Sequence, residues 1–226
     1  MNKRILVLSL LASGGLLLSG VSSAQLNLKQ FGIGGGDSSA NAGAGASSGG
    51  VSQLLQTYVG ANQQVLSGQS SLASAMGLSG AAGQAQQAAG LLSGGTPSVS
   101  QLTQVGSTQQ SLSQTLTQAF ASRASGASAT PVNKQAFTDG LTSLGKGVSQ
   151  YSSLQSGLGS IGQMNPSSLL QSGLNPQTAQ SASYIAKSAP GQLQSLMSTL
   201  SSAVQFASSH GISVPSIATA ALKGGQ

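Results

Sequence analysis

Three short motifs in this chain have the spacing of catalytic or nucleotide-binding sequences. Ser143-Leu144-Gly145-Lys146 places a serine three residues before a lysine, as in hydrolases whose nucleophilic serine works with a lysine. Gly140–Gly147 nearly fits the P-loop that cradles phosphates, and Gly157–Gly162 reads GxGxxG, the dinucleotide-binding fingerprint. A functional motif of this kind would make the protein an enzyme or a nucleotide-binding protein.

The sequence around each motif argues against that chemistry. The P-loop ends in a Ser or Thr that binds magnesium, and Gly147 stands at that position. The GxGxxG fingerprint needs a preceding strand and an acidic residue about 20 positions later, but no acid follows Asp139. A Ser-Lys hydrolase also needs SDN-like and KTG-like elements, and the chain offers only Lys223-Gly224-Gly225 as an approximation to the second.

Titratable side chains are too few for most acid–base or metal chemistry. His210 is the single histidine, Asp37 and Asp139 are the only acids, and the chain has no Cys. General acid–base catalysis needs such groups to converge in one pocket, and a zinc site needs several N, S or O ligands. We therefore predict no catalytic residue, no cofactor-binding residue and no metal ligand, and we interpret the protein as non-enzymatic.

Charge is scarce throughout the chain. Charged residues make up 4% of the sequence, compared with about 25% in an ordinary soluble protein. The formal net charge of +6 reflects the shortage of acids, because the basic residues are spread singly. Nucleic-acid binding normally needs clustered Lys and Arg that neutralise several phosphates, so we expect no nucleic-acid partner.

Residues 1–24 have the three parts of a Sec signal peptide. Lys3 and Arg4 give a positive start, residues 5–18 are mostly Leu, Ile and Val, and Ser22-Ser23-Ala24 is a small-x-Ala end. A retained membrane anchor would need about 20 apolar residues, and Ser and Gly interrupt this run. We predict cleavage after Ala24, which lowers the formal net charge to +4, and a periplasmic or secreted protein.

Composition divides the remaining chain near residue 50. Residues 25–50 are rich in Gly, Ser and Ala, which is typical of a flexible, disordered segment. Residues 51–226 carry helical patterns and are long enough for a single α-helical domain. Because the chain has no Cys and no Trp, we expect a core of Leu, Val, Ile, Met and Ala that is held without disulfides.

The longest helical pattern lies in residues 132–161. Glycines within and just after it each lower helix stability by roughly 1 kcal/mol relative to Ala, so this helix needs partners, which the glycines would allow to approach closely. Apolar residues recur there at spacings of three and four and form one stripe on one helix face: Phe137, Leu141, Leu144, Val148, Tyr151, Leu154, Leu158 and Ile161.

Other periodic patterns complete an all-α prediction, because no alternating β-branched run predicts a strand. We expect an irregular bundle of about four main helices with short proline-started helices. The remaining main helices are predicted at Val51–Met76, at Val99–Phe120 and at Leu193–Ala207 with a stop at His210-Gly211; Gly80–Gly90 is a weak helix or a spacer, and short helices start at Pro166 and Pro176.

All six prolines are predicted to lie at helix boundaries. Pro190 and Pro215 follow Ala and Val, which are poorer capping residues, but we place them at boundaries as well. The other four follow Thr or Asn, which cap helix N-termini, and proline fits the first helical turn: Pro97, Pro131, Pro166 and Pro176.

The composition favours a protein that acts through its surfaces. The first hypothesis is an exported, non-catalytic scaffold, assembly accessory or matrix component with a protein partner or with self-association, because a charge-poor surface does little to keep copies apart. One alternative is a module that binds an apolar ligand or a membrane surface, although membrane-bound helices usually carry rows of Lys or Arg. The other is a Ser-Lys hydrolase that uses Ser143 and Lys146.

The shortage of acids also predicts how the protein responds to pH. Folded proteins lose stability in acid largely because carboxylates that are paired in the native state become protonated. With two carboxylates in the whole chain, we expect nearly the same far-UV circular dichroism at pH 7 and at pH 3. A cooperative loss of the helix signal in this range would contradict the expectation.

Overall fold

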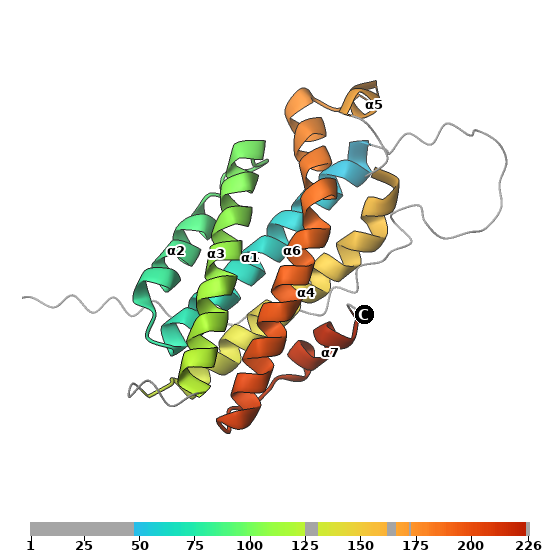
Figure 1. Cartoon of the computed structure of the whole chain (residues 1–226). Coiled ribbons are helices and arrows are strands. Elements are labelled where there is room, and N and C mark those ends of the chain that lie inside the picture. The colour runs from blue at the N-terminus through green and yellow to red at the C-terminus, as the bar shows by residue number, and fades with distance from the viewer. Residues whose placement is uncertain (1–47, 125–130, 162–165, 172, 225–226) are drawn as a thin grey trace, which may run out of the picture. The chain divides into compact units, whose positions relative to one another are not determined.

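The computed structural model describes residues 48–124, 131–161, 166–171 and 173–224, which form helices and contain no strand. The all-α prediction is confirmed, whereas the predicted leader and nearly all of the segment 25–50 lie outside these ranges. Figure 1 shows the helices in chain order: α1 (Ser48–Ala75), α2 (Ser79–Gly90), α3 (Val99–Ala124), α4 (Lys134–Ile161), α5 (Pro166–Gln171), α6 (Pro176–Ser209) and α7 (Ser216–Gly224).

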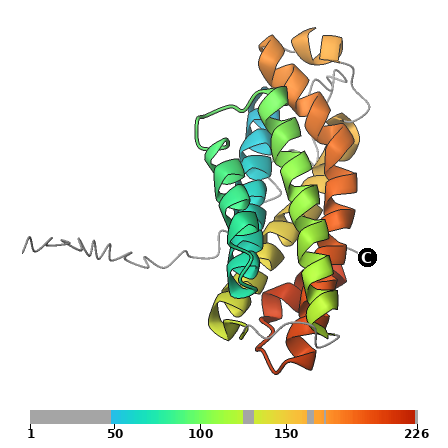
Figure 2. The same ribbon diagram turned by 60° about the vertical axis from the view of Figure 1, so that its left-hand side comes forward.

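Four long helices, α1, α3, α4 and α6, build the bundle, and α2 and α7 pack beside it (Figures 1 and 2). Consecutive helices alternate in direction, because the short α2 returns the chain to the start of α3. As a result α3 and α6 run parallel and side by side. The hydrogen bonds from Ser181 to the Pro97 carbonyl and from Tyr184 to the Leu102 carbonyl follow this direction.

The stripe predicted for residues 132–161 is the buried face of α4. Every described member of the stripe, from Phe137 to Leu158, is at most 5% exposed, and together they join one continuous apolar core with the other helices. The side chain of Ile161 lies outside the described set. Gly80–Gly90, which the sequence left between helix and spacer, forms α2 and buries Ala82, Ala85 and Ala88.

Glycines bring the backbones of α1 and α4 into direct contact. A Cβ atom placed on Gly68 of α1 would lie 2.5 Å from the backbone nitrogen of Leu144, and one placed on Gly140 of α4 would lie 2.9 Å from that of Leu72. Gly147 meets the backbone of α1 in the same way about two turns further along α4. The predicted use of the α4 glycines for close approach is therefore confirmed at these positions.

At the starts of α3 and α4, the capping residue lies two or three positions after the Thr of the Thr-Pro pair that the sequence predicts as the cap. Helix α3 is capped by Ser98, whose Oγ accepts from the Gln101 N–H while Gln101 Oε1 accepts from the Ser98 N–H. Asn133 Oδ1 likewise accepts from the Ala136 N–H at the start of α4. The predicted cap at Thr96 is therefore wrong by two residues, whereas Asn175 caps α6 as predicted.

The predicted boundary at Pro190 is wrong, because this proline lies inside α6. The short helix expected at Pro176 and the long helix expected at Leu193 form one helix of 34 residues. A proline inside a helix costs about 3 kcal/mol. Ile185 and Ala189 before Pro190 are buried on the same side as Leu193 after it, and their shared burial in the core outweighs the proline.

Three phenylalanines close one end of the bundle. Phe120, Phe137 and Phe206 have ring centroids 5.4–5.7 Å apart. His210 stacks on Phe206 with a centroid separation of 3.9 Å, and its Nδ1 lies 2.9 Å from the Phe206 carbonyl oxygen. Gly211 follows with φ +61°, so the predicted helix stop at His210-Gly211 is confirmed.

We expect Gly68→Ala to destabilise the protein. Overpacking a core costs typically 1–3 kcal/mol, and here the added methyl group meets the backbone of Leu144 rather than a side chain that can rotate away. This cost should exceed the gain of roughly 1 kcal/mol in helix propensity. Urea denaturation followed by circular dichroism measures the change.

Gly60→Ala is the matched control on the same helix. A Cβ atom on Gly60 would meet nothing within 4 Å, so this variant should gain up to about 1 kcal/mol in the free energy of unfolding. Equal stabilities for the two variants would show that α1 and α4 do not need the close contact at Gly68.

Candidate functional site

All three tyrosines of the chain gather between the long helices. Tyr58 of α1 donates to Oε1 of Gln192 on α6 at 2.8 Å. The Tyr151 hydroxyl, from α4, lies 2.9 Å from the same oxygen and 2.9 Å from Oδ1 of Asn62. A Cβ atom on Gly106 of α3 would lie 2.7 Å from Gln192 Nε2 and 3.3 Å from the Tyr184 hydroxyl, so the third phenol is at the same place. We call the three tyrosines together with Gln192 the tyrosine cluster.

Buried carboxamides extend the cluster into the core. Gln109 donates to Asn62 Oδ1 at 2.7 Å, and Gln69 donates to Ser113 Oγ at 3.0 Å. Asn62, Gln69 and Gln109 are each at most 2% exposed. The side-chain oxygens of Gln69 and Gln109 have no hydrogen-bond partner among the described residues, and such a buried acceptor typically costs 1–3 kcal/mol. The core of Leu, Val, Ile, Met and Ala that the sequence predicts therefore also contains a polar centre.

A long polar groove runs outside the cluster between α3 and α6. Its first part is a cleft of about 490 Å³ whose lining includes Gln109 and Gln192. A second hollow of about 520 Å³ continues it and shares Ser113, Gly191 and Ser195 with the first. From Thr103 to Gln118 the groove is about 22 Å long at the helical rise of 1.5 Å per residue. We call the two hollows together the α3/α6 groove.

The chemistry of the groove is that of neutral hydrogen-bonding groups. Gln, Ser, Thr and Gly make up most of its lining, and Lys187 is its single charged side chain. Burial disfavours the phenolate form and raises the pKa of Tyr58, and it raises the pKa of Tyr151 well above the usual value of 10. Both phenols stay protonated near neutral pH, so they serve as hydrogen-bond donors rather than as bases.

The motifs that opened the sequence analysis all fall on α4. Ser143 is half-buried and Lys146 is exposed, while the intervening Leu144 is part of the core. Residues 140–147 and 157–161 continue the helix, whereas the nucleotide-binding motifs require an open loop after a strand. Gly162, the last residue of the GxGxxG match, lies outside the described residues.

The described histidine and aspartate side chains do not gather in one place. Asp139 accepts from Gln135, while His210 contacts Phe206 and Ser209. No group of three His, Cys, Asp or Glu residues that could hold a metal occurs within these ranges. Asp37 lies outside them.

Sequence reasoning missed the cluster, although a signal was present. Gln69 fills the gap in the apolar stripe of α1 between Leu66 and Leu72, and Gln109 fills the gap in the stripe of α3 between Val105 and Leu112. A carboxamide at a core position must find hydrogen-bond partners, as must the hydroxyl of a buried tyrosine. These two observations predict a polar centre, but they do not identify Gln192 or Tyr184 as its members.

Comparison of the chain with known protein families, with characterised proteins and with solved structures finds no match. Among the described helices, none is long and apolar enough to cross a membrane.

The buried phenols predict a loss of stability at high pH. Because burial raises the pKa of Tyr58 and Tyr151 above the unfolded value of about 10, their stabilising contribution is complete below pH 10 and is lost as the pH rises beyond it. The free energy of unfolding should then fall by up to about 1.4 kcal/mol per pH unit for each phenol. Urea denaturation between pH 8 and pH 11.5 measures this slope.

The double variant Tyr58→Phe/Tyr151→Phe separates these two phenols from other titrating groups. It should be less stable at pH 8, because Gln192 Oε1 loses both donors, but its stability should fall less steeply above pH 10. Identical slopes in the wild type and the variant would rule out the buried phenols as the cause.

Proposed function

We propose that the protein is an exported, non-catalytic scaffold, assembly accessory or matrix component that acts through protein surfaces, including those of its own copies. One observation carries this proposal, namely a continuous face formed by α2, α3 and α6, three helices on which Lys187 is the one exposed charged side chain. Helix α2 has no charged side chain, α3 has Arg123 alone and α6 has Lys187 alone. We call this surface the glutamine face after its exposed glutamines: Gln84, Gln87, Gln104, Gln110, Gln114, Gln118 and Gln194.

The glutamine face is continuous across the three helices. A hollow between α2 and α3 is lined by Gln84, Gln87 and Gln104, and it shares Ser107 with the α3/α6 groove. Every carboxamide supplies both donors and an acceptor, so two such surfaces can pair without a specific arrangement of charges. The shortage of charge removes the repulsion that normally keeps copies apart.

The same surface gives little support to an apolar ligand or a membrane as the target. Leu170 is the one large hydrophobic side chain that is exposed in the described ranges. A docking site for lipid or for an apolar ligand would need a contiguous apolar patch or a Lys- and Arg-lined amphipathic helix. Export is supported by the signal-peptide pattern of residues 1–24.

The test of the proposal is the mass of the protein in solution. Light scattering after size-exclusion chromatography, over a hundredfold range of concentration, should show a molar mass that increases with concentration for the chain Gln25–Gln226. The variant Gln87→Lys/Gln104→Lys places like charges on the glutamine face of every copy, so it should remain monomeric at low salt. A wild-type protein that is monomeric at all concentrations would overturn self-association.

The matched control is Gln155→Lys/Thr219→Lys, which adds the same charge at exposed positions of α4 and α7. This control should associate like the wild type. Loss of association in both charge variants would show that net charge, rather than the glutamine face, governs assembly.

A further inference from the structure

We propose that the α3/α6 groove binds a saccharide chain that carries carboxylate groups, with sugar hydroxyls against the tyrosine cluster and a carboxylate at Lys187. This inference goes beyond the proposed function, because it needs no contact between copies of the protein. It rests on the unpaired groups at the groove, on the composition of its walls and on its single charge.

The tyrosine cluster fixes one donor at the floor of the groove. Both lone pairs of Gln192 Oε1 are within hydrogen-bond distance of the phenols of Tyr58 and Tyr151. This holds the amide so that Nε2 faces Gly106, where it has no hydrogen-bond partner among the described residues. The Nε2 hydrogens are therefore held in place and open to an acceptor on a ligand.

Gln109 adds an acceptor that lacks a donor. Its side chain is 2% exposed and lines the same cleft. Its Nε2 donates to Asn62 Oδ1, whereas its Oε1 has no hydrogen-bond partner among the described residues. A hydroxyl both donates and accepts, so a sugar hydroxyl can accept from Gln192 Nε2 and can donate to Gln109 Oε1 if that atom, which is covered in this structure, is uncovered on binding. An apolar group would leave Gln192 Nε2 unpaired.

The walls suit an extended, hydroxyl-rich chain. Thr103, Ser107 and Gln110 face the groove from α3, and Ser195 faces it from α6. A Cβ atom on Gly191 would meet nothing within 4 Å, so a ligand can approach the backbone of α6 there. A groove about 22 Å long whose walls are mostly Gln, Ser, Thr and Gly residues matches a polymer more closely than a compact metabolite.

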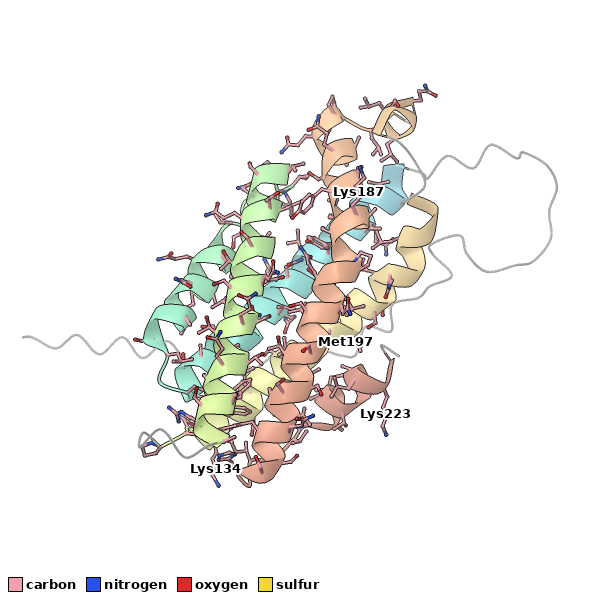
Figure 3. The ribbon with its side chains drawn as sticks, in the orientation of Figure 1. Lys134, Lys187, Met197 and Lys223 are labelled. Carbon is pink, nitrogen blue, oxygen red and sulfur yellow. The ribbon has the colours of Figure 1, made fainter. Side chains whose placement is uncertain are left out.

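Lys187 selects the charge of the saccharide. It is exposed, it is the one charged side chain on α6, and it lies at the first part of the groove. Figure 3 shows Lys187 far from Lys134 and Lys223, so neither of those lysines adds positive charge beside it. One cation suits an isolated carboxylate, as in a uronic acid residue, whereas nucleic acids and polyphosphates need several cations.

The protein is expressed from its full-length gene and purified. It is then titrated with the tetramer of galacturonic acid and, separately, with the neutral galactose tetramer. The chain has no Trp, so its intrinsic fluorescence comes from three tyrosines, of which Tyr184 lines the groove and the other two lie behind it in the tyrosine cluster. We expect saturable binding of the acidic tetramer at one site per chain, with a change in tyrosine emission and at least fivefold weaker binding of the neutral tetramer. Isothermal titration calorimetry gives the stoichiometry.

Two variants test the site. Lys187→Gln should lower the affinity for the acidic tetramer to that for the neutral one. Gly106→Ala should weaken binding at least tenfold, because its methyl group displaces the amide of Gln192, the flexible end of a side chain, while α3 stays folded. Gly60→Ala is the control that adds the same methyl group in open space and should bind like the wild type.

Several results would overturn the proposal. They are the absence of saturable binding, equal affinity for the acidic and neutral tetramers, and equal binding by the Gly106→Ala and Gly60→Ala variants. Capture of a Ser/Gly-rich octapeptide in place of the saccharide would assign the groove to a polypeptide instead. The Gln87→Lys/Gln104→Lys variant keeps the described lining of the groove, so it should still bind, and a failure of self-association is thereby distinguished from a failure of this proposal.

Discussion

The contact between the backbones of α1 and α4 is the constraint on which the rest of the bundle depends. It requires glycine at Gly68, Gly140 and Gly147, because any side chain there would strike the opposite main chain. The same close pairing brings Tyr58 and Tyr151, about one turn beyond Gly147, to a ring-centroid separation of 5.5 Å. A protein with few large aromatic residues and no disulfide can still be tightly packed in this way, because short interaxial distances replace bulky side chains. The glycines, which lower the stability of an isolated helix, thus stabilise the packing of α1 against α4.

The interior is divided between two kinds of aromatic chemistry. Phenyl rings close one end, where Phe206 meets His210 at the C-cap of α6, and phenols occupy the region beside the α3/α6 groove. A buried hydrogen-bonded centre contributes less stability than an apolar one of the same shape. Its partners are directional, however, so Asn62 and Gln192 can fix the register of the helices that carry them. The polar centre is also where the interior meets the surface chemistry of hydroxyls and amides.

The sequence predicts the helices well, because periodic burial dominates their formation. The stripe from Phe137 to Leu158 and the stop at Gly211 needed no tertiary information. Pro190 could not be placed from local preference, because the burial of Leu193 on the same face as Ile185 is a tertiary effect. The tyrosine cluster was hidden for the same reason, since its members lie far apart in sequence. The sequence does show that Gln69 and Gln109 occupy positions in apolar stripes. It does not show which residues would be their hydrogen-bond partners.

Pro190 has a consequence for how α6 can move. Proline has no N–H, so the carbonyl of Ala186 lacks its usual partner four residues later, and Gly191 follows directly. Helix α6 is continuous through this point but lacks that one bond; the part before it is tied to the start of α3 through Ser181, and the part after it to the phenylalanine end through Phe206. The junction lies at Lys187, Gly191 and Gln192, which line the groove. The groove is therefore lined at the point where α6 has one main-chain hydrogen bond fewer than an unbroken helix, so a change of angle there has one bond fewer to strain.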